Sequence, residues 1–436
     1  MPQILDAAQP DFDAAFAALL GAKREDSADV DDIVAGIIAD VRARGDAALV
    51  ELTERFDRLR LDAGGLAFTA AEVDAEIARV SAEDRAALEL AAERIRAYHA
   101  RQMPEDQSWT DPEGATLGWR WSPVSAAGLY VPGGLASYPS SVLMNAIPAR
   151  VAGVERLAIA VPTPDGQANP LVLLAARLAG VDEIYRVGGA QAIAALAYGT
   201  ETIAPVDKIT GPGNAFVAAA KRRVFGRVGI DMIAGPSEIL IVADGDNDPD
   251  WLALDLLAQA EHDESAQSIL ITDDPALARA VAAAVETRLE TLARRDIAGA
   301  SWRDFGAIIT VPDLALAADL ADRIAPEHLE LCVADADALA DRIRHAGAIF
   351  LGHWTPEAIG DYVGGPNHVL PTSRSARFSS GLSVMDFLKR TTLARMTPAA
   401  LAAIGPAAEA LAASESLEAH GLSVRARLDK LNGEER

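Results

Sequence analysis

The sequence predicts an α/β protein with two doubly wound, mostly parallel sheets, a helical N-terminal region and a helical C-terminal tail. From about residue 120, short apolar runs such as RLAIAVPT alternate with helical patterns such as PLVLLAARLAG. A second alternating series begins at GPSEILIVADG and ends at AIFLG. This alternation is typical of βαβ units in a parallel sheet, and two separate series indicate two sheets.

The flanking regions have a different pattern. Up to about residue 110, segments such as SAEDRAALELAAERIRAYHARQ carry apolar residues at helical spacing, with Ser81 as a helix N-cap. Beyond about 386 the pattern is again helical, but this tail is too short to form a core of its own. We therefore expect a helical region at 1–110, a first α/β domain at 111–236, a second at 237–385 and a docked helical tail at 386–436.

Composition indicates a globular protein whose negative charge disfavours binding to anionic molecules. Of the 436 residues, 50% are hydrophobic and 24% are charged. The chain has 39 basic and 64 acidic residues, and its net charge of -25 disfavours binding to nucleic acid or to anionic lipid. The single cysteine, Cys332, excludes an intrachain disulfide and a thiolate zinc site. Without a signal-peptide pattern or an apolar run of about 20 residues, a cytoplasmic protein without membrane contact is expected.

The common nucleotide-binding and catalytic motifs are absent: the sequence has no G-x-G-x-x-G, no G-K-[ST], no C-x-x-C, no H-E-x-x-H and no G-x-S-x-G. Two other stretches could hold a dinucleotide. AGLYVPGGLASYPSSVLMNAIPARVAG places a Gly-Pro turn before a helix that opens at Pro139 and Ser140, and KITGPGNAFVAAAKRR places Asn214 near a helix start. Backbone N–H groups at a helix N-terminus suit an anion.

Two pairs of side chains in the second series could carry chemistry. In LLAQAEHDE, a helix expected over 250–263 places Gln259 and His262 on one face, suited either to a metal ion or to hydrogen bonding at a helix end. In IAPEHLEL, Glu327 and His328 follow Pro326, and Glu and His are the commonest general bases. Neighbouring residues on a turn diverge, so each would act on a different proton. The alternative for this pair is an acidic first helical turn followed by an incidental histidine.

Two further candidates lie nearer the C-terminus. In EAIGDYVGGPNHVLPT, the glycines indicate an irregular loop at the carboxyl end of a strand, which carries Asp361 and His368. An Asp beside Gly is also common in simple turns. In ASESLEAHGLSVRARL, which carries Glu415 and His420, a helix is expected to end at Gly421, so that His420 lies at its C-terminus; the alternative is a solvated, charged tail helix.

The remaining histidines have no evident role. His99 is expected on a polar helix face, and His345 precedes a glycine at a helix end. His353 follows a strand in FLGHW, and no function is assigned to it.

Taken together, these segments resemble the histidinol dehydrogenase family over almost the whole chain. The most specific is IDMIAGPSEILIVADG, followed after a spacer by LLAQAEHDE. Other segments are similar to family segments in the same order: YVPGGLASYPSSVLMNAIPA, VGGAQAIAALAYGT, GPGN, APEHLEL, GDYVGGPNHVLPT, SGLSVMDFLKR and ESLEAHGLS. The resemblance implies two incomplete Rossmann-like sheets, in agreement with the two series and the missing glycine fingerprint.

The resemblance also implies roles for individual residues. The implied ligands of a zinc ion, for which Mn²⁺ or Co²⁺ could substitute, are Gln259, His262, Asp361 and His420. The implied acid–base pair is Glu327 and His328. The implied substrate contacts are Ser237, Glu415, His328 and the metal ligands, and the implied NAD contacts are Tyr130, Gln191 and Asn214.

The activity implied by the family is the four-electron oxidation of L-histidinol to L-histidine through L-histidinal with NAD, the last step of histidine biosynthesis. The metal would hold the imidazole and amine of the substrate, and two bases would suit the two half-reactions. The family forms intertwined homodimers whose tails reach the partner's site, so shared active sites are expected.

Two other functions are alternatives to this one. The first is a related metal-dependent dehydrogenase of another small polyol, such as a sulfonated diol, but Glu415 and His420 favour histidinol. The second is a binding or structural protein, which would have no need of a base pair, a ligand quartet and two dinucleotide-facing turns together.

Overall fold

The computed structural model describes residues 2–21, 29–132, 138–233 and 235–433, and these form two compact units. Unit 1 comprises Met1–Gln102 and Ser125–Phe387, and unit 2 comprises Met103–Val124 and Leu388–Arg436. The expected border at 236 falls inside unit 1, between the last strand of one sheet and the first long strand of the next, and the expected borders at 110 and 385 lie within eight residues of unit limits at 102 and 387. The units differ from the expected domains because of pairing between distant strands, which a local pattern does not record.

The first sheet of unit 1 has five parallel strands in the order β6-β5-β4-β7-β8. They are β4 (Ala126–Tyr130), β5 (Arg156–Ala160), β6 (Glu183–Tyr185), β7 (Lys208–Thr210) and β8 (Gly229–Ile230). From β4 the chain builds outward to β6 and then returns to the other side of β4. The reversal between β4 and β7 marks the place where open α/β sheets bind ligands, outside the carboxyl ends of the strands.

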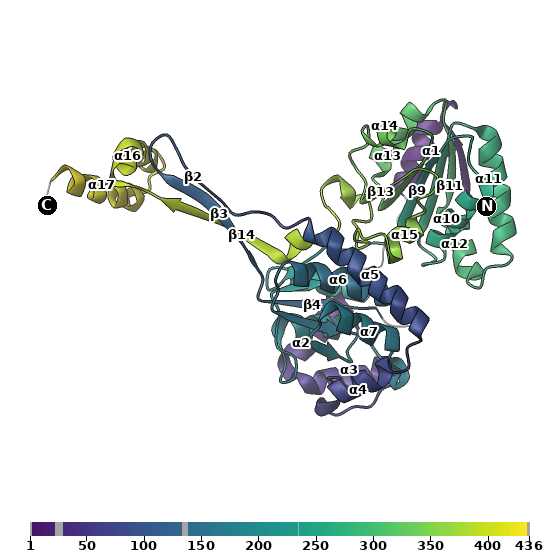
Figure 1. Ribbon diagram of the computed structural model, residues 1–436, viewed down its shortest axis with the longest axis horizontal. Coiled ribbons are helices and arrows are strands. Elements are labelled where there is room, and N and C mark those ends of the chain that lie inside the picture. Colours follow the sequence, from purple (N-terminus) through teal and green to yellow (C-terminus); the bar gives the residue numbers. More distant parts are fainter. Residues whose placement is uncertain (1, 22–28, 133–137, 234, 434–436) are drawn as a thin grey trace. The chain divides into compact units, whose positions relative to one another are not determined.

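Helices cover both faces of the first sheet (Figure 1). On one face lie α8 (Gly189–Tyr198) and α9 (Ala215–Val224), with α2 (Asp29–Arg44) and α3 (Asp46–Asp57) packed outside them. On the other lie α6 (Pro139–Val151) and α7 (Pro170–Ala179), against which α4 (Ala70–Ile77) and α5 (Ala82–Ala100) pack. The strands of this sheet are therefore enclosed between helices, as expected of a parallel sheet.

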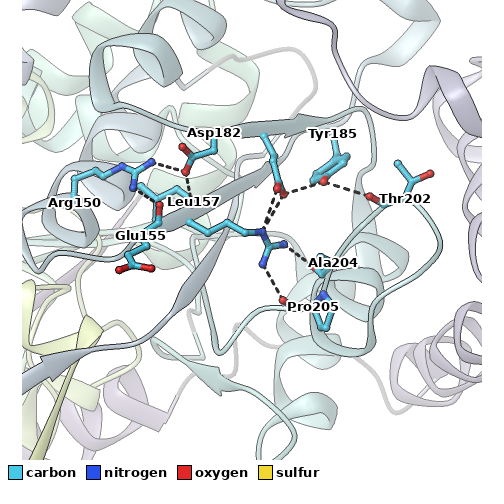
Figure 2. A network of polar contacts seen from close by, with 10 residues as sticks. Arg150, Glu155, Leu157, Asp182, Tyr185, Thr202, Ala204 and Pro205 are labelled. Atoms are coloured by element: carbon cyan, nitrogen blue, oxygen red, sulfur yellow. Dashed lines mark hydrogen bonds and ion pairs between the residues drawn. The ribbon is translucent and has the colours of Figure 1, made fainter.

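A network of charged side chains holds the amino edge of the first sheet (Figure 2). Arg150 pairs with Asp182, whose carboxylate accepts a hydrogen bond from the N–H of Leu157 at 2.8 Å. Arg156 donates to Glu183 at 3.1 Å and to two carbonyl oxygens of the loop before β7. These contacts join neighbouring strands and loops, so this edge has a structural role.

The second sheet of unit 1 has six parallel strands in the order β1-β11-β10-β9-β12-β13. They are β1 (Gln3–Asp6), β9 (Glu238–Ala243), β10 (Gln267–Thr272), β11 (Ala307–Thr310), β12 (His328–Cys332) and β13 (Ala348–Leu351). Apart from β1, the strand order repeats that of the first sheet. Each sheet thus has five strands of the six-stranded Rossmann order, and the expected fold class is confirmed.

Strand β1 corrects the expectation of a purely helical N-terminal region. It pairs with β11, so that Gln3 lies opposite Ala307. The following helix α1 (Phe12–Gly21) buries Phe12 and Phe16 in the core of the second sheet. A four-residue edge strand carries too short an alternation to be detected among helical patterns.

The second sheet is also enclosed by helices (Figure 1). One face is covered by α1, α13 (Leu314–Ile324) and α14 (Ala336–Ala340), and the other by α10 (Pro249–Ala260), α11 (Pro275–Leu289) and α12 (Arg295–Phe305). The short helix α15 (Glu357–Tyr362) packs on α10 and β12. Asp248 caps α10 by accepting a hydrogen bond from the N–H of Asp250 at 2.8 Å, and Pro249 occupies the first helical position.

Unit 2 is a small antiparallel sheet with two helices. Its strands, in the order β14-β3-β2, are β2 (Gln107–Thr110), β3 (Thr116–Pro123) and β14 (Leu388–Arg395). Helices α16 (Pro398–Ser414) and α17 (Glu418–Asn432) pack against each other. The tail is helical as expected, but it begins with a strand whose partner lies far back in the sequence. Within the described residues, none of the helices has the length and apolar character needed to cross a membrane.

Candidate active site

The acid–base candidates of the second sheet lie at its amino edge. Glu238 opens β9 and His328 opens β12, and His328 pairs with Ile239 in the neighbouring strand. Helix α10 returns from the carboxyl edge, as the helix of a βαβ unit must, and it ends at this amino edge. The sequence suggested that the segment of Asp361 lies at the carboxyl edge of a sheet. This expectation is wrong, because Asp361 lies beside His328 at the amino edge.

His328 is buried, and the backbone of Glu238 orients its ring. Nδ1 lies 2.9 Å from the carbonyl oxygen of Glu238, so Nδ1 carries the donated proton and Nε2 keeps a lone pair. Within the described chain, Nε2 has no hydrogen-bond partner. Burial lowers the pKa of His328 to about 4. The ring is therefore neutral at pH 7, and Nε2 can accept a proton or bind a metal.

Glu327 stands beside this ring. Its Oε2 lies 3.7 Å from His328 Nδ1 and accepts a hydrogen bond from the N–H of Glu238 at 2.9 Å. The sequence suggested that the two side chains diverge. They lie together instead because both bond to the backbone of Glu238 at the start of the neighbouring strand.

Helix α15 brings two carboxyl groups to His328. The ligand atoms of His328, Glu357 and Asp361 all lie within 4.8 Å of one another, and His328 Nε2 is 3.6 Å from Glu357 Oε1. The sequence suggested an irregular loop here, but residues 357–362 form a short helix. A spacing of four residues on a helix places Glu357 and Asp361 on one face.

The two carboxyl groups of α15 differ in charge. Burial raises the pKa of Glu357 to about 10, and the charge of Asp361 adds to this effect. Burial alone would raise the pKa of Asp361 as well, but its hydrogen bond to His368 and the neighbouring His328 and His262 lower it to about 2. At pH 7 Glu357 is therefore protonated and Asp361 is a carboxylate.

Glu330 holds the start of α15. It is fully buried, and its Oε1 accepts a hydrogen bond from the N–H of Glu357 at 2.5 Å. Burial and the nearby Asp255 raise the pKa of Glu330 well above its usual range. Sequence analysis missed both Glu330 and Glu357. The alternation of His328, Glu330 and Cys332 on one strand face was a signal for Glu330.

Gln259 and His262 form the adjacent pair that their spacing predicts. Gln259 Nε2 lies 2.9 Å from His262 Nδ1. Helix α10 ends at Ala260, before the expected end at residue 263, so His262 lies in the following turn. Gln259 is fully buried, and its Oε1 has no hydrogen-bond partner in the described part of the chain.

This donor set suits a divalent metal ion. Within this cluster, three buried acceptor atoms lack hydrogen-bond partners in the described part of the chain: Gln259 Oε1, His328 Nε2 and Glu357 Oε1. A buried polar atom without a partner costs about 1–3 kcal/mol, and a bound cation would remove this cost. Nitrogen and oxygen ligands of this kind bind Zn²⁺, Mn²⁺ or Co²⁺.

A cavity of about 510 Å³ reaches this cluster. Its lining includes His328, Phe350, Asp361 and His368, together with Tyr98 of α5. Sites for small molecules commonly have volumes of about 300–1,000 Å³. The cavity is therefore large enough for a small substrate beside the acid–base residues.

The expected cofactor residues lie at the carboxyl edge of the first sheet. Tyr130 ends β4, and its hydroxyl oxygen accepts a hydrogen bond from the N–H of Gly189 at 3.1 Å. Burial raises the pKa of Tyr130 to about 12, so the hydroxyl keeps its proton. Gln191 is buried in α8 with its Oε1 close to Gly189. Asn214 caps α9 after β7, and its Oδ1 accepts hydrogen bonds from two backbone N–H groups at 3.1 and 3.2 Å.

Helix α6 connects this edge to the segment that follows Asp361. It begins at Pro139, and the Gly-Pro turn expected before it falls on residues 133–137, which lie outside the described residues. Asn367 donates to the carbonyl oxygen of Met144 in α6 at 2.6 Å. The neighbouring His368 bonds through Nδ1 to the carbonyl oxygen of Asp361 at 3.0 Å.

The remaining expected substrate contacts lie in both units. Ser237 precedes β9 and is half-buried, and its carbonyl accepts the N–H of Gln267 at 3.0 Å. Glu415 and His420 belong to unit 2, where both are exposed. His420 lies in the first turn of α17 and not at a helix end, because α17 continues through Gly421.

His99 also differs from expectation. It is fully buried, its Nδ1 lies 2.8 Å from the carbonyl oxygen of Ile95, and its Nε2 lies 3.3 Å from Asn367 Nδ2. His353, which had no assigned role, bonds to Asn247 Oδ1 at 2.8 Å.

A two-sheet α/β fold, a dinucleotide-type edge and an acid–base cluster with metal donors are together typical of a dehydrogenase. The family model described as histidinol dehydrogenase matches residues 21–428. The histidinol dehydrogenase of Cereibacter sphaeroides is 81% identical over 432 residues, covering 99% of this chain and 100% of that protein. That of Ruegeria pomeroyi is 79% identical over 433 residues, with 99% and 100% coverage.

A solved structure agrees with these relatives. The crystal structure of histidinol dehydrogenase from Elizabethkingia anophelis has a TM-score of 0.94 and 36% sequence identity, and 99% of each chain is covered. The chain therefore belongs to the histidinol dehydrogenase family, a family of oxidoreductases, and the resemblance noted in the sequence is confirmed.

Proposed function

We propose that the protein oxidises L-histidinol to L-histidine through L-histidinal and reduces two NAD⁺. The observation that carries this proposal is the convergence of Glu327, His328, Glu357 and Asp361, of which His328 and Asp361 line a cavity. The names of the related enzymes support the substrate, and the cluster supports the chemistry.

The metal ion of this proposal is Zn²⁺, with Mn²⁺ or Co²⁺ as possible substitutes. Gln259, His262 and Asp361 of unit 1 would hold it, and its role when bound is to fix the imidazole and amine of the substrate. The Oε1 of Gln259 and the charged carboxylate of Asp361 are the strongest support among these ligands.

NAD⁺ would bind at the carboxyl edge of the first sheet, where Tyr130, Gln191 and Asn214 lie. The reversal of strand order between β4 and β7 favours this place, because Tyr130 ends one strand and Asn214 follows the other. The oxygen of Asn214 is engaged in capping α9, so its NH₂ group is the donor for the cofactor.

The first half-reaction converts the alcohol to the aldehyde. In this proposal His328 Nε2 accepts the hydroxyl proton while the carbon gives its hydride to NAD⁺. The neutral ring, with Nδ1 bonded to the carbonyl of Glu238, has the correct tautomer for this step.

The second half-reaction consumes water. Addition of water to the aldehyde gives a hydrate, from which a second hydride passes to a second NAD⁺ and leaves the carboxylic acid. Glu327 would remove the proton of that water, because it lies beside His328 but has a separate carboxylate. Two bases thus serve two proton transfers.

Glu415 and His420 would complete the site from the second chain of a homodimer, with Ser237 as a further substrate contact. Both tail residues are exposed, and they belong to the small unit that includes the C-terminus. Exchange of such a unit between two identical chains forms a symmetric dimer at little cost.

The shared site can be tested by complementation between Glu327→Ala and His420→Ala chains. Each homodimer should be inactive, but a heterodimer would contain one site with both defects and one intact site. With random pairing, activity should recover to about a quarter of wild type. No recovery in a verified heterodimer would show that each tail serves its own chain.

The overall reaction can be tested by NADH absorbance after mixing the protein, L-histidinol and NAD⁺. Two NADH should form for each L-histidinol consumed, and L-histidinal should also be a substrate. Oxidation of a sulfonated diol in preference to L-histidinol would contradict the proposed substrate.

Asn214→Asp tests the cofactor site, because aspartate keeps the helix cap but removes the NH₂ donor and adds a negative charge. It should raise the KM for NAD⁺ strongly. An unchanged KM would place the dinucleotide elsewhere.

A further inference from the structure

A buried ion pair of the first sheet contacts the turn that leads to Asn214. Lys221 of α9 pairs with Asp231, the residue after β8, and their side chains are only 3% and 1% exposed. Lys221 Nζ donates to the carbonyl oxygen of Gly211 at 3.0 Å, and Asp231 Oδ2 accepts the N–H of Gly211 at 2.8 Å. One ion pair therefore bonds to both backbone polar groups of Gly211.

Gly211 occupies a position that requires glycine. Its φ is +116°, which side chains rarely permit, and a Cβ there would overlap the carbonyl oxygen of Tyr130. The turn thus lies directly against the end of β4. Glycine also has the greatest backbone freedom of all residues, because it has no side chain. The turn therefore needs contacts from other residues to become rigid.

Stability alone does not explain the pair. Removing two charges from water is costly, and apolar replacements of similar volume are often neutral or stabilising. The other polar partner shared by the two side chains is the backbone of Gly211. Fixing that backbone is the effect that apolar residues could not reproduce.

We propose that Lys221 and Asp231 are positioning residues that hold Gly211 so that Tyr130 and Asn214 engage the same dinucleotide. This inference rests on the NAD site proposed above. Asn214 follows Gly211 by three residues and caps the helix that carries Lys221. A change in the backbone at Gly211 would therefore displace Asn214 relative to Tyr130.

The test removes both charges together, in Lys221→Met/Asp231→Leu, so that neither charge stays buried alone. The matched polar variant is Lys221→Gln/Asp231→Asn, which has no net charge but keeps a donor and an acceptor for Gly211. The control is Arg223→Met, which removes an exposed ion pair between α9 and Asp31 but leaves Gly211 untouched. Thermal unfolding, metal content, and KM for NAD⁺ and L-histidinol are measured for each.

The apolar double variant should raise the KM for NAD⁺ about tenfold, since fixing one residue's backbone costs roughly 1–2 kcal/mol. Its kcat at saturating NAD⁺, KM for L-histidinol and metal content should stay at wild-type values. The polar double variant and Arg223→Met should keep the wild-type KM for NAD⁺. A general loss of structure would instead change the KM values for both NAD⁺ and L-histidinol, and the metal content as well.

A folded apolar double variant with wild-type KM for NAD⁺ would refute the positioning role. If that variant does not fold, Lys221→Met/Asp231→Asn is compared with the polar double variant, and equal KM values would refute the role of Lys221. Asn214→Asp separates this inference from the proposed site. If Asn214→Asp weakens NAD⁺ binding while the double variants do not, only the positioning role fails. If Asn214→Asp also has no effect, the NAD site itself is wrong.

Discussion

Apart from β1, the two sheets of unit 1 have the same strand order, but their candidate site residues lie at opposite edges. In the first sheet, Tyr130 and Asn214 lie at the carboxyl edge, where α8 and α9 begin. In the second sheet, His328 and Gln259 lie at the amino edge, where α10 and α13 end. A helix carries partial positive charge at its start and partial negative charge at its end. The first edge therefore suits an anionic dinucleotide, and the second suits a metal cation and a cationic substrate.

The largest expected difference between the two edges follows metal removal, which should abolish activity but leave NAD⁺ binding intact. A chelator should abolish L-histidinol oxidation, and added Zn²⁺, Mn²⁺ or Co²⁺ should restore it, because none of the ligands proposed for the metal lies at the first edge: Gln259, His262 and Asp361 lie at the second edge, and His420 would come from the tail. His262→Ala should lose metal affinity without unfolding. Binding of NAD⁺, measured by calorimetry on the metal-free protein, should be retained. Full activity in protein shown to be metal-free would contradict the proposed metal role.

The next largest effect concerns the two bases at the second edge. Glu327→Gln should slow oxidation of L-histidinal more than oxidation of L-histidinol, because only the aldehyde step consumes water. Removal of a positioned base costs about 10²–10⁴ in rate. Single-turnover kinetics with each substrate measures the two steps separately. Equal losses in both steps would assign Glu327 a role common to both.

The sequence predicted the two sheets because their strands are continuous apolar runs between helices, as in GPSEILIVADG. It also predicted the contact between Gln259 and His262, since helical spacing fixes that geometry locally. It did not predict the pairing of β1 with β11 or of β14 with β3. These pairings join distant segments, and short edge strands carry little periodic signal.

Other parts of the site were missed for a different reason. The glycines after Asp361 suggested a loop, which hid the helical spacing of Glu357 and Asp361. The alternation of His328, Glu330 and Cys332 placed Glu330 on the same strand face as His328, but it could not show that the Glu330 carboxyl group holds the start of α15. His99 was expected on a polar face because burial by another element cannot be read from the helix itself. In each case the missing information is tertiary.

Glu330 offers a smaller and more selective test of the second edge. Glu330→Leu should weaken metal affinity about 10- to 100-fold, a typical effect of losing a partner that orients metal ligands. Glu330→Gln should retain near wild-type affinity, because its amide oxygen can still accept the N–H of Glu357, and because burial raises the pKa of Glu330 and so disfavours its charged form. Equal losses in both variants would show that a charged carboxylate, and not the hydrogen bond alone, is required.

The smallest expected effect lies at His99, which joins α5 to the loop beside Asp361. Its Nδ1 donates to the carbonyl of Ile95, and its Nε2 accepts from the amide of Asn367, so the structure requires the neutral ring. Burial lowers the pKa of His99 below its ordinary value of 6.5.

A histidine whose pKa is lowered by folding stabilises the protein above its unfolded pKa, and this stability is lost as pH falls toward the folded pKa. The free energy of unfolding should therefore decrease below about pH 6.5, by at most about 1.4 kcal/mol per pH unit for one proton. His99→Leu removes this titration but keeps a buried side chain, while Asn367 retains its bond to Met144. Denaturant unfolding between pH 5 and 8 should show a flatter profile for His99→Leu than for wild type. His328 titrates in both proteins, so its contribution cancels in the comparison. Identical pH profiles would mean that His99 does not change its proton affinity on folding, and the link between α5 and the loop would then have no pH dependence.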